Sequence, residues 1–187
     1  MKKTIIIIII IFVSIGLGYA YEQVSTALEK RAHPILYSEF VEKYSQEYSV
    51  PQYIIYSVIK VESSFRSDVE SDRNAIGLMQ ITPDTFEWLM TKTKEDLPVK
   101  LLYDPETNIK YGTFFLQYLY AEFENWDTSF AAYNAGRGAV NGWLKNPQYA
   151  VGNQLIIENI PFPETKDYIR KVNNNKEMYK KLYFSGK

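Results

Sequence analysis

An uncharged apolar run near the N-terminus restricts this chain more than any other feature. Lys2 and Lys3 are followed by 18 residues without a charge, Thr4 to Tyr21, and these include seven consecutive isoleucines. As a helix rising ~1.5 Å per residue, the run would span ~27 Å, close to the ~30 Å hydrocarbon core of a bilayer. The positive-inside rule keeps the two lysines in the cytoplasm, so the rest of the chain is expected outside the cytoplasmic membrane.

The apolar run could be a cleaved secretory signal or a retained membrane anchor. Gly18 and Ala20 are small residues at the two positions that a signal peptidase reads, so the segment could be a secretory signal that is removed. We favour a retained anchor in the cytoplasmic membrane, because the run reaches spanning length and Tyr19 and Tyr21 suit a membrane interface. The predicted organisation is an anchor or signal at 1–21, a polar connector at 22–32 and one domain at 33–187.

Composition excludes several classes of protein. Without residues 1–20 the chain carries 19 basic and 22 acidic residues, which argues against nucleic-acid binding. There is no cysteine, so disulfides, thiolate metal sites and cysteine nucleophiles are excluded. A single histidine, His33, disfavours a histidine metal site or a catalytic triad, and we expect no metal and no cofactor. The 16 Tyr, 10 Phe and 3 Trp can form a substantial core.

Helical periodicity dominates after residue 33. Apolar residues on one helix face recur at Tyr37, Phe40, Val41, Tyr44 and Tyr48. Pro51 is expected in the first turn of a second helix, whose apolar stripe is Ile55, Val58 and Ile59.

Capping signals predict the later helices. Thr82-Pro83 and Asp104-Pro105 each read as a cap followed by the first helical residue. Thr128 is expected to cap a short helix that Gly136 ends, and Pro163-Glu164 to begin the last helix. No alternating segment of comparable quality predicts a strand, so the expected fold class is mainly α.

Glu62 stands out because of its place on a buried stripe. It follows Ile55 by seven residues and therefore projects within about 20° of it, toward the core. Burial would raise the pKa of this carboxyl and keep it protonated near neutral pH, as a general acid requires. The alternative is a structural role, with Glu62 capping backbone groups or pairing with Arg66 or Arg73, and position alone favours it.

Four motifs in order change that balance. They are Glu62-Ser63-Ser64-Phe65 with Ser71 nine residues after Glu62, Ala75 to Ile81, Ala132-Tyr133-Asn134-Ala135-Gly136, and Ile160 to Tyr168. Over residues 33–180 the chain resembles the soluble-lytic-transglycosylase family of peptidoglycan-cleaving enzymes, whose domain has a lysozyme-like fold. Glu70, Asn74 and Lys166 are mild departures from the family pattern.

The resemblance implies roles for eight residues. Glu62 would be the catalytic acid and base, and Ser71 would form a hydrogen bond near the reacting sugar. The glycan groove would be lined by Met79, Gln80, Tyr133, Asn134, Glu164 and Tyr168. Structural roles remain open for three of them: Met79 as core filling, Asn134 as a residue of a helix C-terminus, and Glu164 as a favourable acid in a first helical turn.

The chemistry can proceed with one carboxyl. Glycosidases normally use two, but Asp68, Glu70 and Asp72 lie in a segment that reads as a solvated turn. In a substrate-assisted reaction the N-acetyl group of muramic acid attacks its own anomeric carbon while Glu62 acts first as acid and then as base. The resemblance implies this non-hydrolytic outcome, a 1,6-anhydro end on peptidoglycan glycan strands. The alternatives are a hydrolytic muramidase, a non-catalytic glycan-binding module and a membrane-anchored interaction domain.

Overall fold

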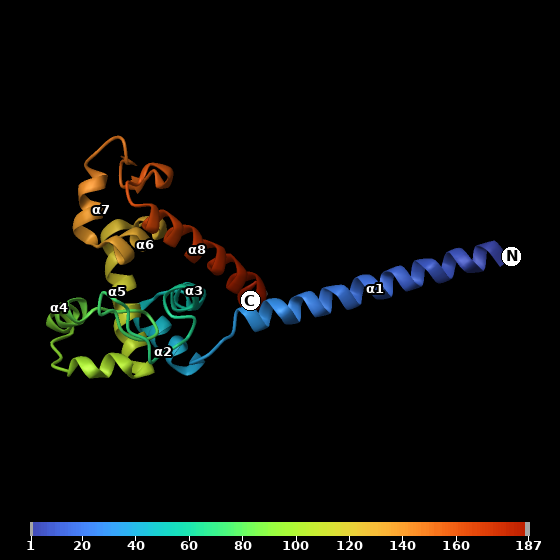
Figure 1. Ribbon diagram of the computed structural model, residues 1–187, viewed down its shortest axis with the longest axis horizontal. Coiled ribbons are helices and arrows are strands. Elements are labelled where there is room, and N and C mark those ends of the chain that lie inside the picture. Colours follow the sequence, from blue (N-terminus) through green and yellow to red (C-terminus); the bar gives the residue numbers. More distant parts are fainter. Residues whose placement is uncertain (1, 186–187) are drawn as a thin grey trace.

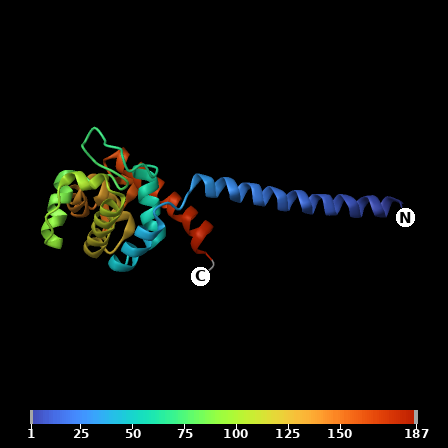
Figure 2. The ribbon, with the colours of Figure 1, turned by 90° about the horizontal axis from the view of Figure 1, so that it is seen from below.

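The computed structural model describes residues 2–185, and side chains are described from Ile5 except at 8–10. Met1, Gly186 and Lys187 lie outside the described residues, as do the side chains of Lys2 and Lys3, on which the predicted orientation rests. One helix, α1 (Lys2–Ala32), projects away from all the other elements in both views (Figures 1 and 2). Of the described helices it alone is long and apolar enough to cross a membrane. Its apolar side chains are exposed, for example Phe12 at 70% and Leu17 at 67%.

The expected polar connector at 22–32 is not a separate segment in conformation. It continues α1 without a break, because no glycine or proline interrupts these residues. Its end is joined to the C-terminal part of the chain. The Tyr183 hydroxyl donates to the carbonyl of His33 (2.9 Å), and Lys181 forms an ion pair with Glu29 (3.1 Å).

Four helices form the part of the domain that follows. These are α2 (Ser38–Tyr48), α3 (Gln52–Glu62), α4 (Pro83–Thr93) and α5 (Pro105–Phe123), with a 3-10 turn η1 (Val99–Tyr103) before α5. Pro51 immediately precedes α3 instead of lying in its first turn. The predicted caps of α4 and α5 are confirmed, since the side chains of Thr82 and Asp104 accept hydrogen bonds from the backbone N–H groups of Thr85 and Thr107.

The remaining elements form the C-terminal part of the domain. They are α6 (Trp126–Ala135), α7 (Arg137–Leu144), a hairpin of β1 (Ala150–Val151) and β2 (Gln154–Leu155), a 3-10 turn η2 (Ile157–Asn159), α8 (Pro163–Tyr179) and a π-helical turn η3 (Lys180–Phe184). In the antiparallel hairpin Ala150 lies opposite Leu155. From the α6–α7 end of the domain, α8 runs to the C-terminal end of α1 (Figure 1).

The predicted cap at Thr128 is wrong. Asn125 caps α6, and its side-chain oxygen accepts hydrogen bonds from the backbone N–H (3.0 Å) and the hydroxyl (3.2 Å) of Thr128. Asn is as good an N-cap as Thr, so the helix begins at the earlier of two suitable residues. Gly136 ends α6 as predicted, with φ at 86°. The short helix α7 and the hairpin were not predicted, because both are too short to carry a periodic pattern.

The core connects α3, α5 and α8. The predicted stripe of Ile55, Val58 and Ile59 is fully buried, and α3 packs against α8. Helix α5 lies against both α2 and α6 and buries Leu116 and Leu119. The predicted mainly α class is confirmed, and Glu62 is the last residue of α3.

Candidate active site

Glu62 is the last residue of α3, and local backbone geometry explains why the helix stops there. Ser64 and Phe65 both take left-handed φ values, 51° and 66°, which turn the chain out of the helix. The Ser63 hydroxyl donates to the carbonyl of Leu78 (2.8 Å) and so fastens the end of α3 to the 75–81 motif. Glu62 is thereby held on a rigid, buried support.

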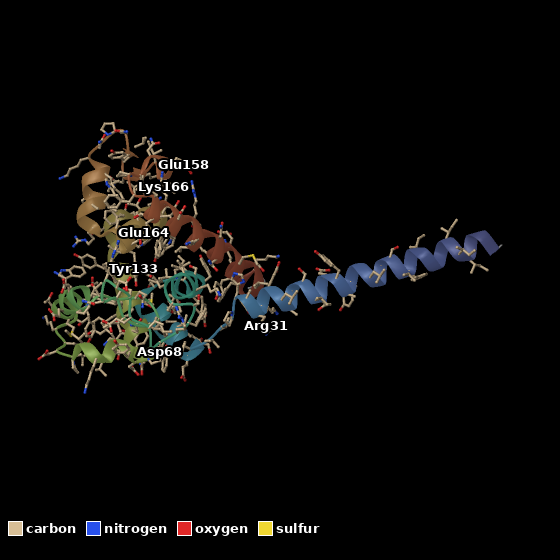
Figure 3. The ribbon with its side chains drawn as sticks, in the orientation of Figure 1. Arg31, Asp68, Tyr133, Glu158, Glu164 and Lys166 are labelled. Atoms are coloured by element: carbon tan, nitrogen blue, oxygen red, sulfur yellow. The ribbon has the colours of Figure 1, made fainter. Side chains whose placement is uncertain are left out.

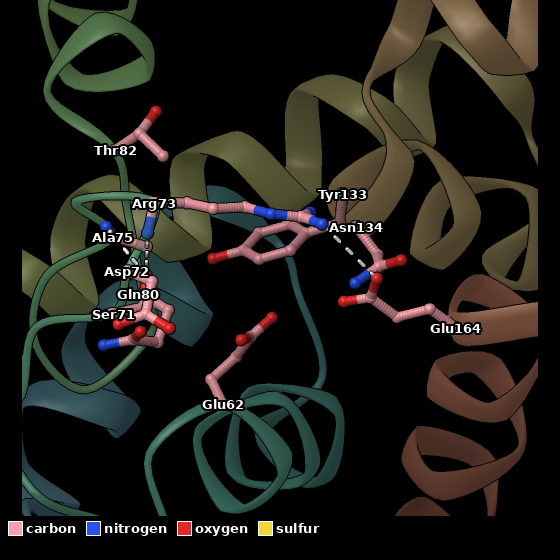
Figure 4. A pocket seen from close by; sticks show the side chains of 10 residues that line it. All are labelled: Glu62, Ser71, Asp72, Arg73, Ala75, Gln80, Thr82, Tyr133, Asn134 and Glu164. Atoms are coloured by element: carbon pink, nitrogen blue, oxygen red, sulfur yellow. Dashed lines mark hydrogen bonds and ion pairs between the residues drawn. The ribbon is translucent and has the colours of Figure 1, made fainter. Parts of the chain in front are cut away.

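Glu62 lies in the wall of a cavity of about 360 Å³. The cavity collects residues from distant parts of the chain, which Figure 4 shows in close-up: Glu62, Ser71, Asp72, Arg73, Ala75, Gln80, Thr82, Tyr133, Asn134 and Glu164. Of the seven other residues expected at the site, five line this cavity, and only Met79 and Tyr168 are absent from its wall.

The electrostatics of Glu62 agree with the inward position expected from the sequence. Burial raises the pKa of Glu62 to about 7, and interaction with Tyr168 partly opposes this rise. The suggested ion pairs do not form: Arg73 pairs with Glu164, and the Arg66 side chain donates to the carbonyl of Ser63 (3.0 Å). Glu62 is thus able to exist in both protonation states near neutral pH, as proton transfer in both directions requires.

The loop at 71–75 presents Ser71. Its hydroxyl oxygen accepts backbone N–H groups from Arg73 (3.3 Å) and Ala75 (3.1 Å). Because both lone pairs are occupied, the hydroxyl hydrogen is available to donate into the cavity.

Gln80 lies where this segment meets α4. Its side-chain amide nitrogen donates to the carbonyls of Gly77 (3.0 Å) and Val69 (3.3 Å), which leaves the amide oxygen as an acceptor. The amide group therefore supports the turn and also lines the cavity.

Asn108 is a supporting residue that the sequence analysis missed. Fully buried on α5, it accepts the Met79 N–H (2.7 Å) and donates to the carbonyls of Ile76 (2.9 Å) and Leu102 (2.7 Å). Gly77 has φ of 78°, and a Cβ there would collide with the Asn108 side chain. A lone Asn in a helix interior gives no signal of this role, because its three partners come from other segments.

Met79 does not line the cavity. Its side chain is fully buried and packs against Gly112, where a Cβ would collide with the Met79 sulfur. The side chain therefore belongs to the core, the alternative that the sequence left open. Met79 reaches the site through its backbone, since its carbonyl accepts the hydroxyl of Tyr133 (2.7 Å).

Two tyrosines flank Glu62. Burial raises the pKa of Tyr133 and of Tyr168 well above their usual value, and the nearby Glu62 adds to the rise in both. Tyr133 comes from α6 and forms part of the cavity wall. The hydroxyl of Tyr168, from α8, is buried, and its interaction with the Glu62 carboxyl opposes the rise in the pKa of Glu62.

Asn134 and Glu164 lie on the α6 and α8 side of the cavity. The Asn134 carbonyl oxygen accepts the hydroxyl of Thr165 (2.8 Å), so the amide NH₂ group is the part of this side chain that can donate to a ligand. Glu164 lies in the first turn of α8, where it favours the helix, and also lines the cavity, so its two interpretations are compatible.

Of the three acids after Glu62, one lines the cavity. Asp72 does so, whereas Glu70 accepts a hydrogen bond from the hydroxyl of Tyr103 (2.6 Å) on the surface. Asp68 is exposed and lies far from Tyr133 and Glu164 (Figure 3). Asp72 is exposed and lies in a turn, as expected, but it also lines the cavity and is therefore the loop acid to consider for a second carboxylate.

Comparisons with known proteins give a consistent result. Residues 39–156 match the family profile described as "Transglycosylase SLT domain". The chain is 37% identical over 163 residues to the soluble lytic murein transglycosylase of Escherichia coli K12, covering 85% of this chain and 25% of that protein. It is 30% identical over 181 residues to the membrane-bound lytic murein transglycosylase C of Edwardsiella ictaluri, covering 85% of this chain and 50% of that protein.

Solved structures agree. The 70 kDa soluble lytic transglycosylase of Escherichia coli superposes with a TM-score of 0.76 at 35% identity, over 84% of this chain and 26% of that one. Its complex with bulgecin A gives 0.77 at 34% identity, over 85% and 26%. The chain thus spans about a quarter of the length of the soluble relatives and half that of the membrane-bound one. With its profile match, its sequence relatives and its lysozyme-like helical fold, the chain belongs to the SLT transglycosylase domain family.

Proposed function

We infer that this protein is a peptidoglycan lytic transglycosylase. It cleaves the β-1,4 bond between N-acetylmuramic acid and N-acetylglucosamine and leaves a 1,6-anhydromuramic acid end. The observation that carries this inference is the carboxyl of Glu62, unpaired by any cation among the described residues, in a cavity where burial raises its pKa to about 7. Membership of the family supports the same conclusion.

The reaction has two steps and consumes no water. Glu62 first donates its proton to the glycosidic oxygen while the acetamido oxygen of muramic acid attacks the anomeric carbon, so the leaving sugar departs as an alcohol. The Glu62 carboxylate then takes the proton of the C6 hydroxyl. The freed oxygen displaces the acetamido oxygen from the anomeric carbon, which closes the anhydro ring and restores protonated Glu62.

The surrounding residues have matching roles in this proposal. Ser71 has a hydroxyl hydrogen and Asn134 an NH₂ group that can donate, so both would bind the acetamido group of the reacting sugar. Tyr133 would form a wall for a sugar ring, because its hydroxyl is held by the Met79 carbonyl. Gln80 and Glu164 would line the glycan groove, and Tyr168 would act on Glu62 from α8.

A hydrolytic muramidase is the second candidate. It is favoured by the position of Asp72 and Glu164 in the same cavity wall as Glu62, since either carboxylate could activate a water molecule. Glu164 is less suited to this role because it is paired with Arg73. The products separate the two reactions: anhydro ends for the transglycosylase and reducing ends for the hydrolase.

The test is cleavage of purified cell-wall sacculi by the full-length chain in detergent, with the sugar ends identified by mass spectrometry. We expect anhydro ends from the wild type and a loss of rate of about 10²- to 10⁴-fold for Glu62→Gln, because an amide cannot transfer the proton. The matched control is Glu158→Gln, which changes an exposed glutamate paired with Arg170 outside the cavity and should preserve activity. A Glu62→Gln protein with activity within about tenfold of wild type would exclude the assignment.

We also propose that α1 holds the enzyme at the outer face of the cytoplasmic membrane. The exposed apolar side chains of α1 and its spanning length support this location. A secretory signal would form the same kind of helix, and N-terminal sequencing separates a retained anchor from a segment that is removed after Ala20.

A further inference from the structure

A second cavity adjoins the one that contains Glu62. Its volume is about 280 Å³, and it shares Arg73, Asn134 and Glu164 with the first cavity. Beyond these three it is lined by Ala135, Phe162, Pro163 and Thr165, and Phe162 is 49% exposed. Because Glu62 is not in its wall, this space is suited to hold a substituent of the reacting sugar and not the bond that breaks.

The Arg73–Glu164 ion pair lies at the boundary between the two cavities. The guanidinium and the carboxylate are 3.5 Å apart, and the Arg73 side chain extends across the pocket above Glu62 to reach Glu164 (Figure 4). Both side chains are largely exposed, at 78% and 69%. An exposed pair of this kind adds little stability, so Arg73 can leave Glu164 for another carboxylate without a large loss of free energy.

Arg73 carries a positive charge in a site that is otherwise lined by acids. The first cavity is lined by the acids Glu62, Asp72 and Glu164, and Arg73 is the single cation among the lining residues of either cavity. Even with Glu62 protonated, two carboxylates face one guanidinium. An anionic ligand would be repelled from this site without Arg73, whose planar guanidinium is suited to bidentate binding of a carboxylate.

Peptidoglycan brings a carboxylate to this position. The lactyl group of muramic acid ends either in a free carboxylate or in an amide-linked short peptide that bears carboxylates of its own. We propose that Arg73 is a specificity-determining residue: it releases Glu164 and binds such a carboxylate, while the adjoining cavity, with exposed Phe162, receives the lactyl or peptide chain. This inference rests on the proposed function, since it concerns a substituent of the same substrate.

The test compares glycan oligomers whose carboxylates are free with the same oligomers after conversion of those groups to amides. We expect the wild-type chain to cleave the carboxylated oligomers with a kcat/KM about tenfold higher, a ratio typical of one charge-assisted hydrogen bond. Arg73→Gln should lose this preference by slowing only the carboxylated substrate. Arg73→Lys should keep part of it, because it preserves the charge without the bidentate geometry.

The matched control is Arg170→Gln. Arg170 is also an exposed arginine paired with a glutamate, Glu158 at 2.8 Å, but it lines neither cavity, so its loss should leave the preference unchanged. Peptide-free and peptide-bearing oligomers show which carboxylate is recognised. If only peptide-free oligomers show the preference, Arg73 binds the carboxylate of the lactyl group. If only peptide-bearing oligomers show it, Arg73 binds a carboxylate of the peptide. An equal loss on carboxylated and amidated substrates would overturn the inference, because it would mean that Arg73 only supports the fold.

Binding separates this inference from the proposed function. The affinity of both oligomers is measured with Glu62→Gln and with the double variant Glu62→Gln/Arg73→Gln. If Glu62→Gln binds the carboxylated oligomer more tightly and the double variant does not, the role of Arg73 is supported. This holds even if the wild type cleaves neither oligomer, a result that would refute the proposed function. The absence of a binding preference in Glu62→Gln overturns the role of Arg73 whether or not cleavage occurs.

Discussion

For single residues, the burial that raises the pKa of Glu62 also reduces the stability of the fold. Its folded pKa, about 7, lies above the 4.5 of an ordinary glutamate. Below pH 4.5 the carboxyl is protonated in both the folded and the unfolded state, and no difference arises. As pH rises toward 7, the unfolded chain ionises freely while the folded chain must hold the proton or bury a charge, so the free energy of unfolding decreases.

We therefore expect Glu62→Gln to become more stable relative to the wild type between pH 4 and pH 8, by up to about 3 kcal/mol at the upper end. Urea unfolding of both proteins at several pH values measures this difference. The exposed control Glu158→Gln should show no such gain. If Glu62→Gln instead lost stability relative to wild type as pH rises, Glu62 would have to be ion-paired in solution, which is the structural role that its sequence position left open.

At the scale of elements, α5 organises the loop that carries most of the cavity wall. Asn108 joins α5 to the 76–79 turn and to η1 through three buried hydrogen bonds. The same turn supplies the carbonyl that holds Tyr133 and the backbone that precedes Gln80. Helix α5 contributes no residue to the wall of the Glu62 cavity, yet Asn108 supports the turn on which the positions of Gln80 and Tyr133 depend.

Asn108→Ala should destabilise the protein by about 3 kcal/mol or more, because it leaves the Met79 N–H and the carbonyls of Ile76 and Leu102 buried without partners. Thermal or urea unfolding measures the loss. The matched control is Asn174→Ala, at an exposed position of α8, where a change within about 0.5 kcal/mol is expected. Equal effects of the two substitutions would contradict the role assigned to Asn108.

In the whole molecule, α1 projects from the domain and contacts it at the C-terminal end of the helix. Its 31 residues correspond to ~46 Å of helix, of which ~30 Å would lie in hydrocarbon and the remainder would hold the domain away from the bilayer. Contacts of Glu29 with Lys181 and of His33 and Pro34 with Tyr183 and Tyr179 fix the end of this helix.

We expect the protein expressed in bacteria to remain in the membrane fraction with residues 1–21 attached. Intact-mass measurement and N-terminal sequencing check this, and Ala20→Leu provides the control because it removes the small residue that a signal peptidase requires. Wild type and Ala20→Leu should have the same processing. Soluble wild-type protein that begins at Tyr21, together with a longer Ala20→Leu protein, would show that the segment is a cleaved signal.

Local spacing in the sequence predicts the features that depend on residues within one or two helical turns. The caps at Thr82 and Asp104, the buried stripe of α3 and the inward direction of Glu62 follow from local spacing. These features could be predicted because a helix presents a face with a period of 3.6 residues and its first N–H groups need a nearby acceptor.

Contacts between distant residues depend on how the helices pack, and local spacing did not predict them. The tertiary structure directed the Met79 side chain into the core against Gly112, and it surrounded Asn108 with three partners. It also paired Arg73 with Glu164, 91 positions further along the chain, and so left Glu62 without the cation that its neighbours in sequence offered. Whether a side chain is buried or ion-paired depends on how whole helices pack against one another. The spacing of residues within one helix carries no information on those contacts.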